Sequence, residues 1–327
     1  MIKPITWSTG KFPYDIVCAQ DDREEWQQAH LSGVGASQIA AVLGEARFGS
    51  RLRIWAENIG RLEPRDFSDN EAVQMGLELE PIVAKKYQER TGRLIDRAGE
   101  LLRSTTYPWA ICTPDYWTLD DNGEHSIPVQ IKTTSAYRLN DWADGCPKEV
   151  WWQVQHEMLV TGAPWASVGV LVGGQRFMWA DVERDDDAIG RIIIEGEKFW
   201  EHIQDQTYTE VDGNDIEAIL DIFPESNDFV DIALPQDATT WDVELLEKKA
   251  QKGMLEQEIA DLESKLKLAI GDSERGVLHN GSGAYTHKNQ SRWNYKPMST
   301  EVIPTEEGQI VMCIASKSNF RVLRRSK

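Results

Sequence analysis

The 327-residue sequence lacks the features of membrane and secreted proteins. No run approaches the roughly 18 consecutive apolar residues of a transmembrane helix, so no membrane association is expected. The N-terminal segment MIKPITWSTGKFPYD has neither the apolar core nor the small-residue cleavage site of a secretory signal. The cysteines are few and form no C-x-x-C pair: Cys18, Cys112, Cys146 and Cys313. The pattern predicts the reduced thiols of a cytoplasmic protein, and neither a disulfide framework nor a zinc site.

Basic residues are scarce, with 35 Lys and Arg against 54 Asp and Glu and a net charge of −19. Residues 276–327 reverse this balance, because their eight basic and three acidic residues give a net charge of +5. Residues 1–275 therefore carry −24. An acidic body argues against non-specific coating of DNA. It leaves open a narrow basic channel, or an acidic site whose charge is offset by metal ions.

The length predicts about two domains. Helical patterns dominate the first 91 residues, and short strand-like segments then alternate with helices at residues 148–161 and about 185–206. This order predicts an α/β fold with a central mixed sheet flanked by helices. Asp185-Asp-Asp187 is typical of a charged helix start. The expected division is a core at 1–206, a connecting segment at 207–237, and a C-terminal extension at 238–327 with a long helix and a basic β-rich tail.

The candidate catalytic residues lie on either side of the segment Asp120-Asp-Asn-Gly123. This segment is typical of a tight turn and predicts a hairpin between segments 109–114 and 127–132. Gln130 and Lys132 share one face of the second strand, and pairing brings Asp115 beside them. A carboxylate, a second oxygen ligand and a lysine suit metal-assisted hydrolysis of a phosphodiester. Taken alone, the same pattern also fits a surface lysine and a turn aspartate.

Five sequence blocks follow one another in order between about residues 24 and 203: Trp26…His30-Leu-Ser-Gly-Val-Gly-Ala-Ser37, Met75-Gly-Leu-Glu-Leu-Glu80-Pro, Thr113-Pro-Asp115, Val129-Gln-Ile-Lys132 and Trp152-Gln-Val-Gln155. Together they resemble the YqaJ-like viral recombinase family, which includes the lambda-type exonuclease and belongs to the PD-(D/E)XK nuclease superfamily. The resemblance implies a nuclease core and an Mg²⁺-dependent 5′-to-3′ exonuclease of duplex DNA, with Mn²⁺ as a substitute ion. It also implies 3′ overhangs that pass to a single-strand annealing protein in phage or prophage recombination, in the cytoplasm of a bacterial host cell.

The resemblance also implies roles for single residues. Lys132 would be the catalytic lysine, Gln155 would lie beside it, and Ser37 would lie near the 5′-phosphate. His156 and Glu157, on the same helix as Gln155, are expected to be solvated or supporting. The implied metal ligands are Asp115, position 130, the Ile131 carbonyl and, through water, Glu80.

Two positions depart from the family pattern. Most members have Glu where this chain has Gln130, and an amide offers one neutral oxygen in place of a carboxylate. Weaker metal binding and weak or absent activity are therefore expected, and the glutamine is either engineered or a natural variant. His30 stands where the family usually has an arginine for the 5′-phosphate. Either a protonated His30 binds the phosphate, or one of the nearby arginines replaces it: Arg47, Arg51 or Arg53.

Further candidates for DNA contact lie outside these blocks. Trp117 and Trp142 could stack on bases, although tryptophans more often belong to a core. Lys288 and Arg292 of the basic tail could guide DNA. A ring-shaped trimer or tetramer is expected from the family and from the acidic body. Two rival functions stay open: a non-catalytic module that binds DNA ends or a partner, and a structure-specific endonuclease.

Overall fold

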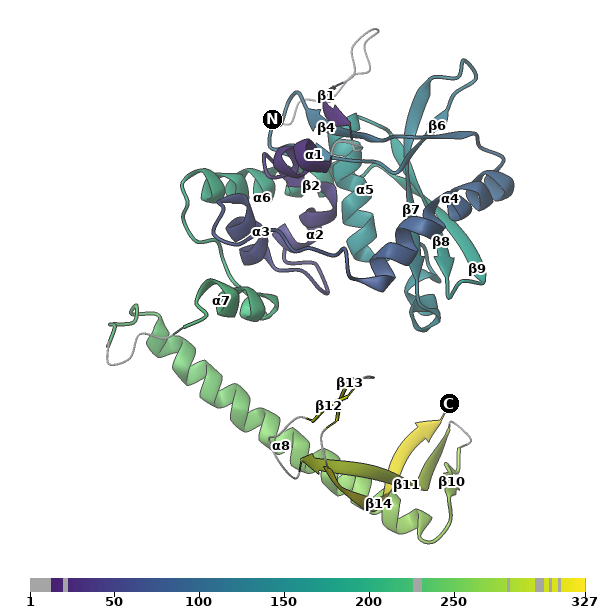
Figure 1. The fold of residues 1–327 in the computed structure, drawn as a ribbon, viewed down its shortest axis with the longest axis vertical. Coiled ribbons are helices and arrows are strands. Elements are labelled where there is room, and N and C mark those ends of the chain that lie inside the picture. Colours follow the sequence, from purple (N-terminus) through teal and green to yellow (C-terminus); the bar gives the residue numbers. More distant parts are fainter. Residues whose placement is uncertain are drawn as a thin grey trace. The chain divides into compact units, whose positions relative to one another are not determined.

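The computed structural model describes residues 13–19, 23–225, 231–280, 283–297, 303–305, 308–310 and 313–326. The chain forms two compact units, Met1–Asn227 and Asp228–Lys327 (Figure 1).

The first unit is built on a five-stranded sheet with the order β3-β6-β7-β8-β9. β7 pairs with β8 in parallel and every other pair is antiparallel, which confirms the predicted mixed sheet. The long β7 lies at the centre, so both of its faces are available for helices. The strands are β3 (Ile95–Arg97), β6 (Tyr116–Leu119), β7 (His125–Thr134), β8 (Trp165–Val172) and β9 (Arg176–Glu183).

A second sheet of four strands has the order β1-β4-β5-β2. The predicted hairpin between segments 109–114 and 127–132 is wrong in its first strand. The strand in segment 109–114 is β5, which pairs with β4 and β2 of this sheet and not with β7. Pro114 follows β5 and has no N–H for a ladder, so the chain leaves the sheet there and restarts as β6. The strands are β1 (Tyr14–Ala19), β2 (Val34–Gly35), β4 (Glu100–Ser104) and β5 (Ala110–Cys112).

The turn itself closes as predicted, between β6 and β7. The Asp120 carboxylate accepts hydrogen bonds from the backbone N–H groups of Asn122 and Glu124, at 2.8 and 2.9 Å. Gly123 has a φ of 81°, in the left-handed region that favours glycine. This turn fixes the register in which β6 lies against β7.

Helices α4 (Glu71–Thr91) and α5 (Lys148–Thr161) cover opposite faces of the five-stranded sheet (Figure 1). On one face, Tyr87 of α4 packs with Val129 and Ile131 of β7. On the other face, α5 packs in the main core with alternate residues of β8, including Val168 and Val170. Gln130 and Lys132 pair in register with those two valines, so their side chains face α5.

The remaining helices of the first unit surround this core. The Asp185 side chain accepts hydrogen bonds from the N–H groups of Asp187 and Ala188, which confirms the predicted helix start. The helices are α1 (Arg23–His30), η1 (Ala36–Gln38), α2 (Ile39–Val42), α3 (Arg51–Asn58), η2 (Ala136–Trp142), α6 (Asp186–Gln204), η3 (Gly213–Asp215) and α7 (Ile216–Ile222).

Part of the segment expected to connect two domains packs on the core. Asp215 is 1% exposed and accepts a hydrogen bond from the Leu52 N–H at 3.1 Å and another from the Ser50 hydroxyl, at the start of α3. A buried carboxylate at a helix start satisfies N–H groups that the helix itself leaves unpaired. Residues 213–222 therefore lie with the first unit, whose boundary comes after Asn227. The predicted three-part division as such stays a prediction.

The second unit contains the predicted long helix and a β-rich tail. α8 spans Ala238–Ile270, and β10, β11 and β14 form an antiparallel sheet in that order. Lys288 is exposed and lies 4.0 Å from Glu274, whereas the side chain of Arg292 lies outside the described part. The strands are β10 (Arg275–Val277), β11 (Ala284–Pro297), β12 (Ile303–Thr305), β13 (Gly308–Ile310) and β14 (Cys313–Ser326).

None of the described helices has both the length and the apolar character needed to cross a membrane.

Replacing Asp215 by alanine should destabilise the first unit. The change leaves the Leu52 N–H and the Ser50 hydroxyl without their acceptor, at a cost of about 1–3 kcal/mol. Thermal unfolding of the variant should therefore shift down by roughly 2–4 °C per kcal/mol. Glu217→Ala removes an exposed carboxylate of the same segment and is the control, with a shift near zero. Equal shifts in both variants would refute the anchoring role of Asp215.

Candidate active site

Asp115 and β7 are joined at the centre of the sheet. Asp115 directly precedes β6, and its Oδ2 accepts a hydrogen bond from the Ile131 N–H at 2.7 Å. One residue further on, Lys132 Nζ donates a hydrogen bond to Gln130 Oε1 at 2.7 Å. The structure therefore brings together the three side chains that the sequence placed in one site.

Glu80 reaches the same place from α4. Burial raises the pKa of Glu80, and the negative charge of Asp115 raises it further, whereas Arg97 and Lys132 lower it. Burial also raises the pKa of Asp115, against the lowering effects of Lys132, the Ile131 N–H and Arg97. Two acids that repel each other in a partly dry site are a favourable setting for a cation.

The oxygen donors in this site fit a hard divalent cation such as Mg²⁺ or Mn²⁺. They are the carboxylates of Asp115 and Glu80, the amide oxygen of Gln130 and the backbone carbonyl of Ile131. Among the residues that the structure describes, no three His, Cys, Asp or Glu side chains converge closely enough to hold a metal ion. At position 130 the chain offers an amide, so this donor set has one carboxylate fewer than the family pattern.

Gln155 lies elsewhere than predicted. Its side chain is buried, donates to the Glu183 carbonyl oxygen at 2.8 Å and accepts from the Asp185 N–H at 2.9 Å. It thus joins α5 to the end of β9. Residues two apart on a helix point about 200° away from each other, so Gln153 and Gln155 cannot both face β7.

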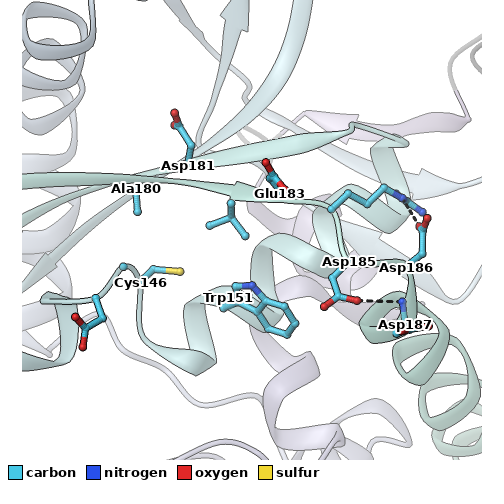
Figure 2. A pocket seen from close by; sticks show the side chains of 12 residues that line it. Cys146, Trp151, Ala180, Asp181, Glu183, Asp185, Asp186 and Asp187 are labelled. Atoms are coloured by element: carbon cyan, nitrogen blue, oxygen red, sulfur yellow. Dashed lines mark hydrogen bonds and ion pairs between the residues drawn. The ribbon is translucent and has the colours of Figure 1, made fainter.

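The pocket next to this junction is acidic, with a volume of about 600 Å³ (Figure 2). Figure 2 shows three of the lining side chains, with Trp151 drawn between Cys146 and Asp185, the residue before α6. Asp115, Gln130 and Lys132 are not among its lining residues. The acidic pocket is therefore separate from the candidate active site.

The sequence analysis missed a pair of side chains on α5. Gln153 Nε2 donates a hydrogen bond to Glu157 Oε1 at 3.0 Å, one helical turn along. Glu157 is 0% exposed, and its Oε2 has no hydrogen-bond partner. The expectation of a solvated or merely supporting Glu157 came from its charge. A second signal was available, because Glu157 is four residues from Gln153 on a helix expected to pack on the sheet.

Glu157 also lies within the electrostatic reach of the site. Burial raises its pKa to about 8, and the negative charge of Asp115 adds to the rise. The charge of Lys132 and the amides of Gln153 and Gln130 act in the opposite direction. Glu157 is therefore a neighbour of the candidate active site on the α5 side of β7.

A cavity of about 1110 Å³ adjoins this pair. Gln153 lines it together with Ser37, His30 and Arg53. Three aromatic side chains, Trp26, Phe48 and Phe67, also line the cavity. The cavity therefore connects the predicted 5′-phosphate residues to a side chain that contacts Glu157.

His30 is unsuited to the predicted phosphate contact. Its ring is mostly buried, stacks on Trp26 with 4.8 Å between ring centroids, and lies where a Cβ on Gly35 would meet it at 2.9 Å. Burial lowers the pKa of His30, which favours the neutral ring over the protonated one. A phosphate contact through a protonated His30 would have to overcome this effect.

The candidate arginines differ in their positions. Arg53 lines the cavity, where Glu57 and Asp221 pair with it. Arg51 pairs with Glu210 at 3.4 Å. Arg47 lies 4.0 Å from Asp141 and lines a different pocket. Only Arg53 of the three is placed beside Ser37.

Both tryptophans predicted to stack on bases are buried in the core. Trp117 is 3% exposed and stacks on His125, and Trp142 is 5% exposed. Neither ring presents a face to a base. Burying the large apolar surface of an indole ring stabilises the fold. This explains why both tryptophans take the core position that is more usual for this residue.

Comparison with known proteins places the chain in a family. Residues 25–164 match the YqaJ-like viral recombinase domain. The uncharacterized protein YqaJ of Bacillus subtilis (strain 168) is 30% identical over 264 residues, which cover 79% of this chain and 81% of that protein.

Solved structures are also similar to part of the chain. An alkaline exonuclease from Laribacter hongkongensis is 27% identical, with a TM-score of 0.48, over 56% of this chain and 93% of that one. A phage related exonuclease from Haemophilus somnus 129PT is 14% identical, with a TM-score of 0.40, over 55% and 99%.

The core has the mixed sheet between helices that the resemblance to PD-(D/E)XK nucleases led us to expect, with Asp115 just before β6 and Lys132 on the neighbouring β7. The chain matches the family's domain and is similar to the Bacillus subtilis protein over most of the length of both. This chain therefore belongs to the YqaJ-like viral recombinase family.

Proposed function

We propose that this protein is a metal-dependent DNA exonuclease of a phage or prophage recombination system. It digests one strand of linear duplex DNA from the 5′ end and leaves 3′ single-stranded overhangs. The observation that carries the proposal is the convergence of Asp115, just before β6, with Gln130 and Lys132 of β7, while Glu80 of α4 lies within their electrostatic reach. Membership of a viral recombinase family supports the biological setting.

In this proposal, oxygen atoms of this chain bind Mg²⁺, or Mn²⁺ in its place. Asp115, the Gln130 amide and the Ile131 carbonyl would hold the ion, with Glu80 close by. A bound divalent ion supplies positive charge at the scissile phosphate. Asp115 is held in place for this role because its second oxygen is fixed by the Ile131 N–H.

Lys132 provides the cationic side chain of the reaction. Its ammonium group is held on the α5 side of β7 by the hydrogen bond to Gln130 Oε1. From there it orients the attacking water and offsets the negative charge that develops on the phosphate.

The cavity lined by Ser37, Arg53 and Gln153 receives the 5′-terminal phosphate in this proposal. Ser37 is exposed and offers a hydroxyl donor. Arg53 supplies a positive charge on the same wall, and a phosphate would compete for it with Glu57 and Asp221.

The proposed partners follow from the same activity. Double-stranded DNA ends are the substrate, and a single-strand annealing protein coats the product strand. A ring-shaped trimer or tetramer would keep the enzyme on its substrate, with Lys288 and Arg292 of the tail guiding the DNA. The acidic body is compatible with such a ring, because an acidic outer surface repels DNA. Basic residues lining a central channel would then be the surface that attracts it.

Linear and circular duplex DNA distinguish this proposal from its rivals. With Mg²⁺, the protein should degrade linear DNA, leave closed circles intact, and stop when the ion is chelated. Nicked circles would instead establish an endonuclease. Bound but uncut DNA ends would establish a non-catalytic end-binding module, a rival that the amide at Gln130 favours.

Lys132→Ala should reduce the rate on linear DNA by about 10²–10³-fold, the usual cost of removing one group that stabilises transition-state charge. Lys148→Ala is the matched control, because Lys148 is exposed and pairs with Glu45 away from the site. Its rate should equal that of the unmodified protein. Undiminished cutting by Lys132→Ala would remove this lysine from the mechanism.

Ser37→Ala tests the 5′-phosphate cavity with an internal control. On linear DNA with 5′-phosphorylated ends the variant should be at least about tenfold slower, because one hydrogen bond to a charged phosphate is worth about 1.5 kcal/mol or more. On DNA with 5′-hydroxyl ends the variant and the unmodified protein should have equal rates. A slowing that is the same for both kinds of end would contradict the assignment of Ser37.

A further inference from the structure

Glu157 is a buried acid that the proposed function leaves unused. It is 0% exposed, and only one of its two oxygens has a hydrogen-bond partner, Gln153 Nε2. A buried carboxylate with an unsatisfied oxygen is costly to the fold. Such a group calls for an explanation beyond packing, because an uncharged side chain of similar volume would fill the space more cheaply.

The position of Glu157 supplies that explanation. Gln130 and Lys132 face α5, because they pair in register with Val168 and Val170, which pack under that helix. The amide of Gln130 and the charges of Asp115 and Lys132 all bear on the Glu157 carboxyl. The chain therefore has an amide on β7 and a carboxylate next to it on α5.

We propose that Glu157 supplies from α5 the carboxylate that the metal site lacks at Gln130. The amide then stands on the strand and the carboxylate on the helix, and Glu157 supplies the negative charge that Gln130 lacks. This inference rests on the proposed function, since it concerns the ion that the proposed reaction requires. It also makes Gln130 a working part of the site, and not a defect.

The two side chains act as one unit. Gln130 Oε1 accepts the Lys132 hydrogen bond at 2.7 Å, so the amide holds the lysine in place. Gln153 Nε2 holds Glu157 Oε1 at 3.0 Å, and the free Oε2 is the oxygen available to a cation. The carboxylate adds negative charge behind Asp115, where a divalent ion gains from it even without direct contact.

Calorimetric titration of the full-length protein with Mn²⁺ alone tests the inference, since the readout is binding and not turnover. Glu157→Gln should weaken Mn²⁺ binding at least tenfold. The exchanged variant, Gln130→Glu with Glu157→Gln, should bind within threefold of the unmodified protein, because it returns the carboxylate to β7. Glu201→Gln, an exposed change of equal charge on α6, is the control and should leave affinity unchanged.

Gln130→Glu alone gives a third, independent result. With Glu157 still present, it places two buried carboxylates side by side, and their repulsion offsets the gain from a second ligand. Mn²⁺ affinity should therefore rise less than threefold. A tenfold rise would show that position 130 simply lacks a ligand, which overturns the inference. This variant and the exchanged one keep the test decisive if Glu157→Gln fails to fold.

The remaining outcomes separate the inference from the function on which it rests. Unchanged Mn²⁺ binding in Glu157→Gln, or an exchanged variant that binds no better than Glu157→Gln, overturns the role of Glu157 only. If the unmodified protein binds no Mn²⁺, the proposed metal site fails and takes the inference with it. If it binds Mn²⁺ as expected but cuts no DNA, the role of Glu157 stands and the exonuclease proposal falls.

Discussion

The hydrogen bond between the Ile131 N–H and the Asp115 carboxylate is the contact on which the site depends. It ties the start of β6 to the middle of β7, at the point where Pro114 has turned the chain out of the other sheet. A backbone donor cannot be moved without shifting the strand, so Asp115 has a fixed position relative to Gln130 and Lys132. The backbone of β7 thus sets the arrangement of Asp115, Gln130 and Lys132.

The alternation of β7 divides its residues between two tasks. Val129 and Ile131 pack under α4 with Tyr87, and this packing holds the strand against the helix that carries Glu80. Gln130 and Lys132 point to the other face, toward α5. Polar groups on a nearly closed face must be satisfied by their neighbours. That requirement explains why the α5 residues near them, Gln153 and Glu157, are polar in an otherwise apolar helix face.

The sequence alone predicted the mixed sheet, the long helix 238–270 and the joining of Asp115, Gln130 and Lys132, because strand periodicity and turn chemistry are local signals. The predictions from sequence were wrong where a residue's position depends on which helix or strand packs against which. The strand at 110–112 pairs with another sheet, and Gln155 holds β9. The full burial of Glu157 likewise depends on how α5 packs on the sheet, although its spacing from Gln153 was a signal in the sequence.

The charge of the site has a consequence for how the proposed enzyme meets DNA. Two basic side chains, Lys132 and Arg97, act on Asp115 and Glu80, and Lys132 also acts on Glu157, within a body that is itself strongly acidic. A phosphodiester brought to this site without a metal ion would lie close to the ionised carboxylates and would be repelled by them. In the proposed function, cation binding therefore comes before productive DNA binding, or together with it. Burial raises the pKa of each of the three acids, and a bound divalent ion would favour their ionised forms, whereas a phosphate alone would not.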